Sequence, residues 1–412
     1  MREMKDSGVE WIGEIPAHWS PIRFRFIAKI TTGNQDTQNA DPDGEYPFYV
    51  RSPIVERCNN YTFDGKGILM AGDGAGAGRV FHLVDGKYAV HQRVYRFYDF
   101  KYMDPVLLKY YLENLFATVM DYGSAKTTVP SVRLPMIQDF VVCVPPKKEQ
   151  DNIVAVLNEK CAQVGSLISN VQAQIEKLEA YKQSLITEVV TKGLDPTVPM
   201  KDSGVEWIGN IPAHWTANKI IRCFGVIGSG TTPTSADDAL FEGDINWIQS
   251  GDINGSVLSE TRFQITRDIV EETSALKVYS APFIVIAMYG ASIGNLSISQ
   301  IDACTNQACC VLSKPVNGLL LEYLFYAFKP AKDYLIWRAD GGGQPNISQE
   351  KLKSLWIPIP PNEDQVVIVQ HLNKKCGQID YLIALKQSKI EKLEQYKRSL
   401  IYEYVTGKRE VS

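Results

Sequence analysis

The amino-acid sequence predicts an α+β protein made of two copies of one frame, each combining a compact domain with a long helix. Two repeated blocks carry this prediction: residues 4–19 match 200–215 at 15 of 16 positions, and residues 145–191 match 360–406 at 26 of 47. The segments between the blocks share little sequence, so the two copies hold different inserts. The repeat offset grows from 196 to 215, which places 19 additional residues in the second insert.

The composition is that of a globular protein and excludes several classes. A length of 412 residues suits two or three domains, and a net charge of −4 excludes a uniformly basic nucleic-acid coat. The longest apolar run, 281–291, is about half of a membrane span, and no secretory signal is readable at the N-terminus. The 8 cysteines form no CxxC pair, so we expect a cytoplasmic protein with reduced thiols and no membrane partner.

Each longer block has the pattern of a coiled-coil helix, because apolar residues recur at alternating steps of four and three. Lys182 and Lys397 interrupt the two patterns at equivalent positions, where a polar residue often fixes register. Paired prolines precede the helices, and Gly193 and Gly407 follow them as stop signals. We expect the two helices to pack on each other; the alternative is that they serve an oligomer. The expected seam consists of Leu157, Val164, Ile168, Ile175, Leu178 and Leu185 in the first helix and Leu372, Ile379, Ile383, Ile390, Leu393 and Leu400 in the second.

The two inserts have the pattern of small α+β domains, because each contains several β-rich runs and one helical stretch. The expected strands lie at 46–50, 61–63, 67–72, 78–84 and 88–98 in the first insert and at 245–249, 277–290, 295–301 and 307–312 in the second. The expected helical stretches, 105–120 and 317–338, are each followed by a short strand at 140–146 or 355–361.

The sequence carries no motif of a catalytic or metal site. It has no GxxxxGKS or GxxxxGKT phosphate loop, no HExxH, and no Asn/Asp-Pro-Pro-Tyr/Phe motif of an amine methyltransferase. A nuclease-like set could combine Asp43 with the DGK runs at 64–66 or 85–87, but Asp-Gly is a common turn pair between strands. We therefore expect no catalytic residues and no metal. A standalone nuclease is an alternative and would lose metal-dependent cleavage on Asp64→Ala.

The loops of the inserts suit contact with nucleotide bases. The inserts have net charges of +1 (20–144) and −3 (216–359), so neither binds nucleic acid by general basic charge. Asn and Gln pair with adenine and Arg with guanine, and the second insert is rich in polar loops while the first gathers arginines. A solvated turn is the alternative for any single loop. The loops 122–134 and 341–352 occupy the same place in both copies, which favours a shared role.

On these residues the chain resembles the specificity subunits of Type I restriction-modification systems over nearly its whole length. The similarity rests on WIGxIPxHW in each short block, and on an acidic residue followed by Gln after each double proline (Glu149-Gln150, Asp364-Gln365). GSGTTP at 228–233, NIS at 346–348, the IEKLExYKxSLI helix and VTGK at 405–408 complete it. Two departures are TTGNQDT at 31–37, where SGxTP is expected, and VTKG at 190–193.

The resemblance implies both architecture and partners. Two globular target-recognition domains are separated by two long conserved helices that form an antiparallel coiled coil with pseudo-twofold symmetry. Each domain reads one half of a bipartite, asymmetric double-stranded DNA target, and the conserved regions dock two methyltransferase subunits and, indirectly, restriction subunits. S-adenosylmethionine, ATP and Mg belong to those partners, so this chain is implied to be a non-catalytic recognition subunit without a cofactor.

The implied boundaries are an N-terminal conserved segment (1–19), the first recognition domain (20–144), the central helix (145–193), the repeated segment (194–215), the second recognition domain (216–359) and the C-terminal helix (360–412). The expected DNA contacts of the first domain are Arg79, His91, Gln92, Arg93, Lys126, Thr127 and Thr128. Those of the second are Thr231, Gln249, Asp252, Tyr289, Ser292, Asn306, Gln307, Gln344 and Asn346. The alternative function is a coiled-coil scaffold whose inserts bind protein, which predicts no salt-dependent DNA binding by the assembled complex.

Overall fold

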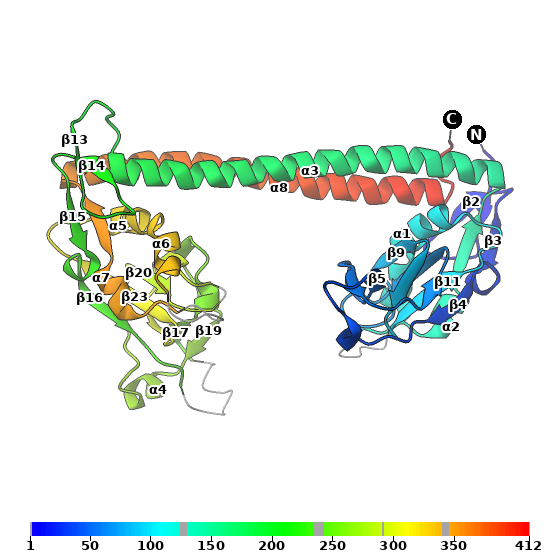
Figure 1. Cartoon of the computed structure of the whole chain (residues 1–412), viewed down its shortest axis with the longest axis horizontal. Helices are drawn as coiled ribbons and strands as arrows, with labels where there is room; N and C mark the ends of the chain where they lie inside the picture. Colours follow the sequence, from blue (N-terminus) through cyan, green and yellow to red (C-terminus); the bar gives the residue numbers. More distant parts are fainter. Residues whose placement is uncertain (1, 124–129, 234–242, 291, 340–345, 412) are drawn as a thin grey trace. The chain divides into compact units, whose positions relative to one another are not determined.

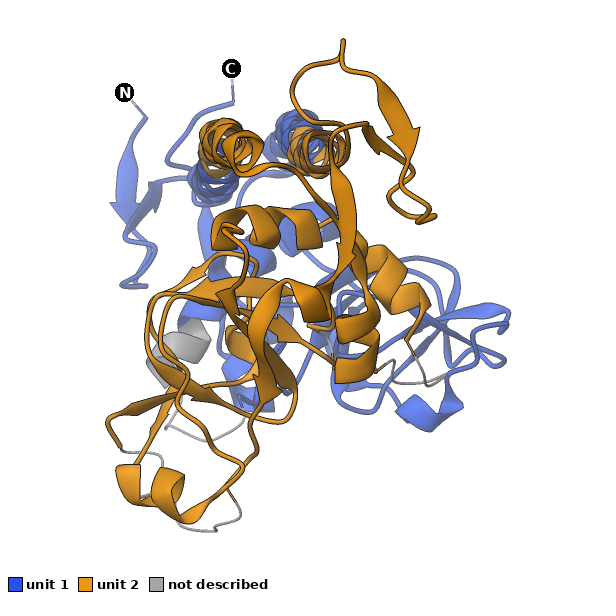
Figure 2. Ribbon diagram, turned by 90° about the vertical axis from the view of Figure 1, so that its left-hand side faces the viewer, with its two compact units in different colours: residues 1–172, 387–412 blue, residues 173–386 orange. Residues whose placement is uncertain are grey.

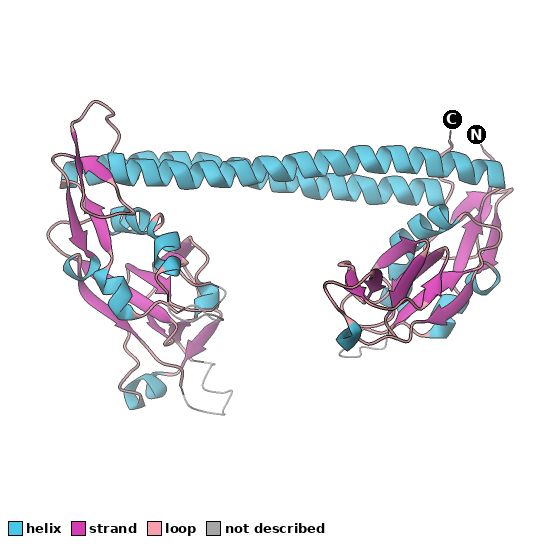
Figure 3. Cartoon of the chain, viewed as in Figure 1, coloured by secondary structure: helices cyan, strands magenta, loops and turns pink. Residues whose placement is uncertain are grey.

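The computed structural model describes residues 2–123, 130–233, 243–290, 292–339 and 346–411, and these fall into two compact units (Figures 1 and 2). Unit 1 comprises Met1–Gln172 with Gln387–Ser412, and unit 2 comprises Ala173–Lys386. The long helices α3 (Lys147–Lys192) and α8 (Asn362–Val405) each contribute one part to each unit. Both units mix helices with strands (Figure 3), which confirms the expected α+β class.

Unit 1 consists of short strands and two further helices. Its strands are β1 (Met4–Asp6), β2 (Glu14–Pro16), β3 (Ser20–Arg23), β4 (Lys29–Thr32), β5 (Tyr46–Tyr49), β6 (Glu56–Cys58), β7 (Phe63–Asp64), β8 (Gly67–Ala71), β9 (Phe81–Val84), β10 (Lys87–Val90), β11 (Val94–Tyr98) and β12 (Val141–Val144). Its helices are α1 (Pro105–Gly123) and α2 (Leu134–Gln138), with 3-10 turns η1 (Phe24–Phe26) and η2 (Thr37–Asn39).

Two four-stranded sheets form the body of unit 1. The first, in the order β4-β11-β8-β9, is antiparallel, and the second, β6-β5-β10-β7, contains the parallel pair β5–β10. All five residues of β8 are buried, which suits the apolar run GILMA to an inner strand. Helix α1 packs on β8 and β9, and its apolar face joins a core that continues into α3 and α8.

Unit 2 has a similar inventory. Its strands are β13 (Met200–Asp202), β14 (Asn210–Pro212), β15 (Thr216–Lys219), β16 (Phe224–Ser229), β17 (Ile245–Ile248), β18 (Val257–Leu258), β19 (Phe263–Ile265), β20 (Phe283–Ala287), β21 (Leu296–Ser299), β22 (Ala303–Thr305), β23 (Cys309–Pro315) and β24 (Trp356–Ile359). Its helices are α4 (Arg267–Glu272), α5 (Leu321–Phe328), α6 (Ala331–Trp337) and α7 (Gln349–Ser354), with 3-10 turns η3 (Ile220–Arg222) and η5 (Ser250–Asp252).

The inserts have the same topology although their sequences differ. The order β16-β23-β20-β21 repeats β4-β11-β8-β9 with β18 added at the edge, and β19-β17-β22 repeats β6-β5-β10, including the parallel pair. Most of the additional length of the second insert lies between β17 and β20. Segment 249–282 is longer than its counterpart 50–66 and contains η5, β18, β19 and α4.

The short repeated blocks form β-hairpins, β1–β2 and β13–β14, in the same register. The glycine of WIG is required at this place, because Gly13 and Gly209 both have φ +67, a conformation that side chains strain. The tryptophan that ends each block, Trp19 or Trp215, is fully buried. The block is therefore a fixed structural element that closes one end of each unit's core.

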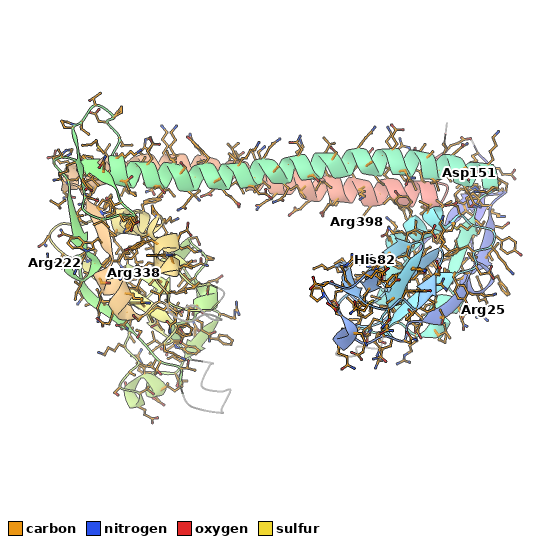
Figure 4. All side chains as sticks on the ribbon, viewed as in Figure 1. Arg25, His82, Asp151, Arg222, Arg338 and Arg398 are labelled. Carbon is orange, nitrogen blue, oxygen red and sulfur yellow. The ribbon has the colours of Figure 1, made fainter. Side chains whose placement is uncertain are left out.

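The long helices pack antiparallel. In unit 2, Lys182 Nζ lies 2.6 Å from Asp380 Oδ1 and Lys386 Nζ lies 2.5 Å from Gln174 Oε1. The later residue of α3 thus pairs with the earlier residue of α8, as in an antiparallel pair. In unit 1, Asn114 Nδ2 donates to the carbonyl oxygen of Arg398 on α8 at 2.9 Å, which ties α1 to this helix. Arg398 is labelled in Figure 4. All twelve residues of the expected seam are buried or half-buried. Lys182 thus has an acidic partner in the seam.

Three expected elements differ from the structure. The run 88–98 forms two strands in different sheets, β10 and β11, because the chain turns at 91–93. The helical stretch 317–338 is divided into α5 and α6 at Pro330, which lacks the N–H that a continuous helix needs. The run 277–290 is a strand only from Phe283, directly after Pro282.

Candidate nucleic-acid interface

The turn that links the two sheets is built in the same way in both units, and we call it the crossover turn: residues 91–93 in unit 1 and 306–308 in unit 2. In unit 1 the backbone N–H of His91 donates to Tyr49 O at 3.0 Å, and His91 Nδ1 accepts from the N–H of Arg93 at 2.9 Å. In unit 2 the N–H of Asn306 donates to Ile248 O at 3.0 Å, and Asn306 Oδ1 accepts from Ala308 N–H at 3.1 Å.

The structure shows a local role for His91 inside the turn, and its expected DNA contact stays a prediction. Its side chain is 4% exposed, and burial lowers its pKa, which favours the neutral ring whose Nδ1 accepts the Arg93 N–H. His91 therefore shapes the turn, while Gln92 and Arg93 are exposed to solvent. Asn306, half-buried, shapes the turn of unit 2 in the same way, and Gln307 is exposed there.

Both turn glutamines are held by the segment that follows the first strand of the sheet. Gln92 Nε2 donates to Asp36 Oδ2 at 2.6 Å, and the Thr232 hydroxyl donates to Gln307 Oε1 at 2.7 Å. Hydrogen bonding fixes the direction of an amide that would otherwise rotate freely. Both expected candidates, Gln92 and Gln307, therefore occupy one equivalent and oriented position.

A glycine brings this segment against the crossover turn in both units. A Cβ on Gly33 would lie 1.9 Å from Val90 O, and a Cβ on Gly230 would lie 1.8 Å from Thr305 O. No other residue fits such a contact. The segment TTGNQDT at 31–37 therefore occupies the place of GSGTTP in the fold, although its sequence departs from that motif. Thr231 lies half-buried directly after Gly230.

Unit 1 places two arginines around one carboxylate beside its crossover turn. Asp73 Oδ1 lies 3.0 Å from Arg51 Nη1, and Asp73 Oδ2 lies 3.8 Å from Arg93 Nε. Both arginines are exposed enough for these ion pairs to contribute little to stability, which leaves the guanidinium groups available to a ligand. Arg51 and Asp73 also line a cavity of about 700 Å³. Arg79 is exposed in the following loop, between β8 and β9.

The equivalent loops of unit 2 carry amide and hydroxyl groups. Tyr289 and Asn346 pair through an isolated β-bridge, at the place where Asp73 pairs with Ser131 in unit 1. Tyr289 is half-buried, burial raises the pKa of its hydroxyl, and the hydroxyl lies within hydrogen-bond reach of Gln307. The carboxylate of Asp252 accepts the N–H of Gln249 at 2.9 Å. Asp252 is therefore used inside its own turn, whereas Asn346 is exposed.

The remaining expected contacts are placed as follows. Ser292 is half-buried in the β20–β21 loop, where its carbonyl accepts Asn295 N–H at 2.9 Å. Lys126, Thr127, Thr128 and Gln344 lie outside the described residues. Sequence reasoning missed Arg51, Asp73 and Asp36, because only the parallel pair β5–β10 and the loop register bring them to the crossover turn.

A second cluster joins each repeated block to a long helix, and we call it the anchor cluster: His18, Trp19 and Glu149 in unit 1, and His214, Trp215 and Asp364 in unit 2. Glu149 Oε2 accepts from Trp19 Nε1 at 3.0 Å and lies 2.9 Å from His18 Nε2. Asp364 Oδ2 lies 2.9 Å from both Trp215 Nε1 and His214 Nε2. Burial alone would raise the pKa of Glu149, but hydrogen bonds from His18, Arg2 and Trp19 hold it below its usual value.

The glutamine after each acidic residue joins the long helix to the domain helix. Gln365 accepts from Leu320 N–H at 2.9 Å and donates to Pro360 O at 3.0 Å. Gln150 accepts from Asp104 N–H at 2.7 Å and donates to Tyr102 O and Pro145 O at 2.7 and 2.8 Å. Both glutamines are 2% exposed. The acidic-Gln pair of the sequence is thus a structural joint.

Within the described residues no group of three or more His, Cys, Asp or Glu side chains is placed to hold a metal ion. The DGK runs named above form turns: Gly65 N–H donates to Gly86 O at 2.9 Å, and both glycines have positive φ. In the same part of the chain, no helix is long and apolar enough to cross a bilayer.

Comparison with known proteins matches this architecture. The model of the Type I restriction modification DNA specificity domain matches residues 16–177 and again 220–395. The EcoDI specificity subunit of Escherichia coli is 21% identical over 422 residues, covering 96% of this chain and 89% of the relative. The MjaVIII specificity subunit of Methanocaldococcus jannaschii is 24% identical over 421 residues, covering 96% and 93%.

A solved structure, described as the structural basis underlying complex assembly and conformational transition of the type I R-M system, contains a chain with the same fold. Its TM-score is 0.69 at 17% identity, with 96% of this chain and 99% of that chain covered. The family match covers most of the sequence and occurs once in each copy of the repeat. The chain therefore belongs to the Type I restriction-modification DNA specificity family, as a non-catalytic specificity subunit that carries the specificity domain twice.

Proposed function

We propose that each insert reads one half of a bipartite, asymmetric DNA target through its crossover turn and the loops beside it. The observation that carries this proposal is that one backbone arrangement presents different side chains in the two units. Gln92 and Arg93 of unit 1 stand where unit 2 has Gln307 and Ala308. Two domains with the same docking geometry and different base-facing groups would recognise different half-sites.

The chemistry of the two loop clusters favours different bases. Arg51 and Arg93 offer paired guanidinium donors, which suit the O6 and N7 acceptors of guanine or a phosphate. Gln307, Asn346 and the Tyr289 hydroxyl offer amide and hydroxyl groups, which suit the donor and acceptor pair of adenine. The negative charge of the second insert fits readout of base edges better than a contact made mostly with phosphates.

The repeated parts, in this proposal, dock two methyltransferase subunits, and restriction subunits join through them. The anchor clusters give the chain two closely similar surfaces, as two identical partners require. S-adenosylmethionine, ATP and Mg are bound by the partners, and the complex acts on chromosomal DNA in the cytoplasm. The partners also supply phosphate contacts that this weakly acidic chain lacks.

The test is a domain exchange with methylation mapping. Residues 216–359 are replaced by the corresponding insert of another family member, and the chain is expressed with its methyltransferase in a methylation-deficient bacterium. We expect a split motif with a fixed gap, of which one half changes on exchange and which disappears when this chain is omitted. A change in both halves would contradict one half-site per domain. Absence of any motif with an intact partner would favour a protein-binding scaffold.

A further inference from the structure

The two anchor clusters differ in their acidic residue, Glu149 or Asp364, and in an arginine, Arg2, that only unit 1 adds. In unit 1 the guanidinium of Arg2 bonds Glu149 Oε1, lies 3.1 Å from His18 Nε2, and stands 5.6 Å from the centre of the Trp19 ring. The side chains of Arg2 and Glu149 are only 16% and 20% exposed. Both oxygens of this carboxylate are therefore used, one by the arginine and one by the His-Trp pair.

In unit 2 the place of the arginine is open. Val198 stands at the repeat position of Arg2, and the side chain of Asp364 is 40% exposed. Oδ2 of Asp364 serves His214 and Trp215, whereas no hydrogen bond or ion pair reaches Oδ1 within the described part of the chain. A cavity of about 230 Å³ lies here, several times the ~30 Å³ that one water occupies.

The cavity has the walls that an arginine side chain needs. Val198, Val367 and Ile368 supply apolar contact for the methylene groups, and Trp215 supplies a ring at the position that Trp19 has beside Arg2. Lys192 also lines the cavity but forms no ion pair with Asp364 within the described residues. A planar guanidinium suits a carboxylate beside an indole better than an ammonium does.

We propose that this cavity is the receptor for an arginine side chain of the methyltransferase subunit, which completes in trans the cluster that Arg2 completes in cis. The inference rests on the proposed function, because it takes the partner from there. It has a consequence for assembly. Of the two anchor clusters that identical partners meet, one is already filled by Arg2 and the other has the open cavity beside Asp364. Binding of a methyltransferase subunit at unit 2 therefore depends on the cavity, and binding at unit 1 does not.

The first test counts and titrates methyltransferase subunits on the full chain by native mass spectrometry. We expect Val198→Arg to fill the cavity in cis and Asp364→Asn to remove its acceptor, each weakening one of the two binding events about tenfold. Asp364→Glu is the matched control and retains both events, because Glu149 serves the same cluster in unit 1. Two unweakened events in Val198→Arg would overturn the proposal.

The second test needs no partner and separates this inference from the proposed function. The full chain is labelled with 5-fluorotryptophan, and its fluorine NMR spectrum is recorded during titration with arginine amide. Lysine amide is the matched probe. We expect the Trp215 resonance to shift saturably with arginine amide in the wild type and in Asp364→Glu, but not in Val198→Arg. The Trp19 resonance responds only in Arg2→Val, where the equivalent space is opened. The proposal would be overturned if the Trp215 resonance did not shift with arginine amide, or shifted equally with both amides, even if the chain binds methyltransferase.

Discussion

Replacing Gln365 by alanine tests whether the acidic-Gln pair is the joint between long helix and domain. The substitution leaves Leu320 N–H and Pro360 C=O without the partner that now lies 2.9 or 3.0 Å away. Each buried group left unsatisfied costs about 1–3 kcal/mol, and the Leu320 bond is only partly buried, so we expect a loss of about 2–4 kcal/mol. Because Leu320 precedes the first residue of α5, the loss falls on the attachment of this helix to α8.

Hydrogen exchange read by mass spectrometry measures this loss locally, which matters because the units share two helices and a single unfolding midpoint would average them. At 1.36 kcal/mol for each tenfold change, protection of α5 should fall by about 30- to 900-fold in Gln365→Ala. Gln370→Ala is the matched control, since this glutamine is exposed on the same helix, and it should change stability by less than about 0.5 kcal/mol. Equal protection of α5 in the two variants would refute the reasoning.

Three further expectations concern unit 1. His91→Ala should disrupt the crossover turn and abolish methylation that depends on one half-site. His91→Asn should retain the turn and the methylation, because Asn306 accepts the corresponding backbone N–H in unit 2. Methylation mapping of both variants tests this. Arg93→Ala should cost about 1–3 kcal/mol in DNA affinity of the assembled complex and alter one half-site only, measured by competition titration at fixed salt; a uniform loss on all sequences would mean a phosphate contact. The folded-state pKa of Glu149 is lowered, so its contribution to stability is complete above the unfolded value of 4.5 and is lost as pH falls through the folded pKa. In Glu149→Gln, the stability of unit 1, measured by hydrogen exchange, should therefore fall less steeply as pH falls below 4.5. The same pH dependence in the variant and the wild type would contradict this.

The features predicted from the sequence are those that follow from periodic patterns and from identity between the copies. Seam residues such as Leu157 and Leu372 are buried because a step of four and three places them on one face of a helix. The fold class, the repeat and the long helices can be predicted without knowing which distant residues are in contact. The crossover turn cannot be predicted in this way. Residues 88–98 have a continuous strand pattern, and only the assignment of β10 and β11 to different sheets makes 91–93 a turn.

The same difference explains which site residues sequence reasoning missed. Loop composition predicts which segments carry polar side chains, but it does not distinguish the exposed Arg93 from the buried His91 two positions earlier. Arg51 lies in a segment with no motif and reaches Asp73 only because β5 runs parallel to β10. Long-range pairing of this kind leaves no periodic signal in the sequence.

The contrast between near-identical blocks and dissimilar inserts has a physical cause. In the blocks several residues are held by specific contacts or backbone conformations: Trp19 and His18 share one carboxylate oxygen, and Gly13 holds a positive φ. Few substitutions satisfy such contacts, so both copies keep the same residues. The sheets require only apolar side chains of suitable size at alternating positions, and even the crossover turn accepts either His91 or Asn306 as its acceptor. Residues exposed around such a turn are free to differ without cost to the fold, which is the property that a surface selected for different DNA sequences needs.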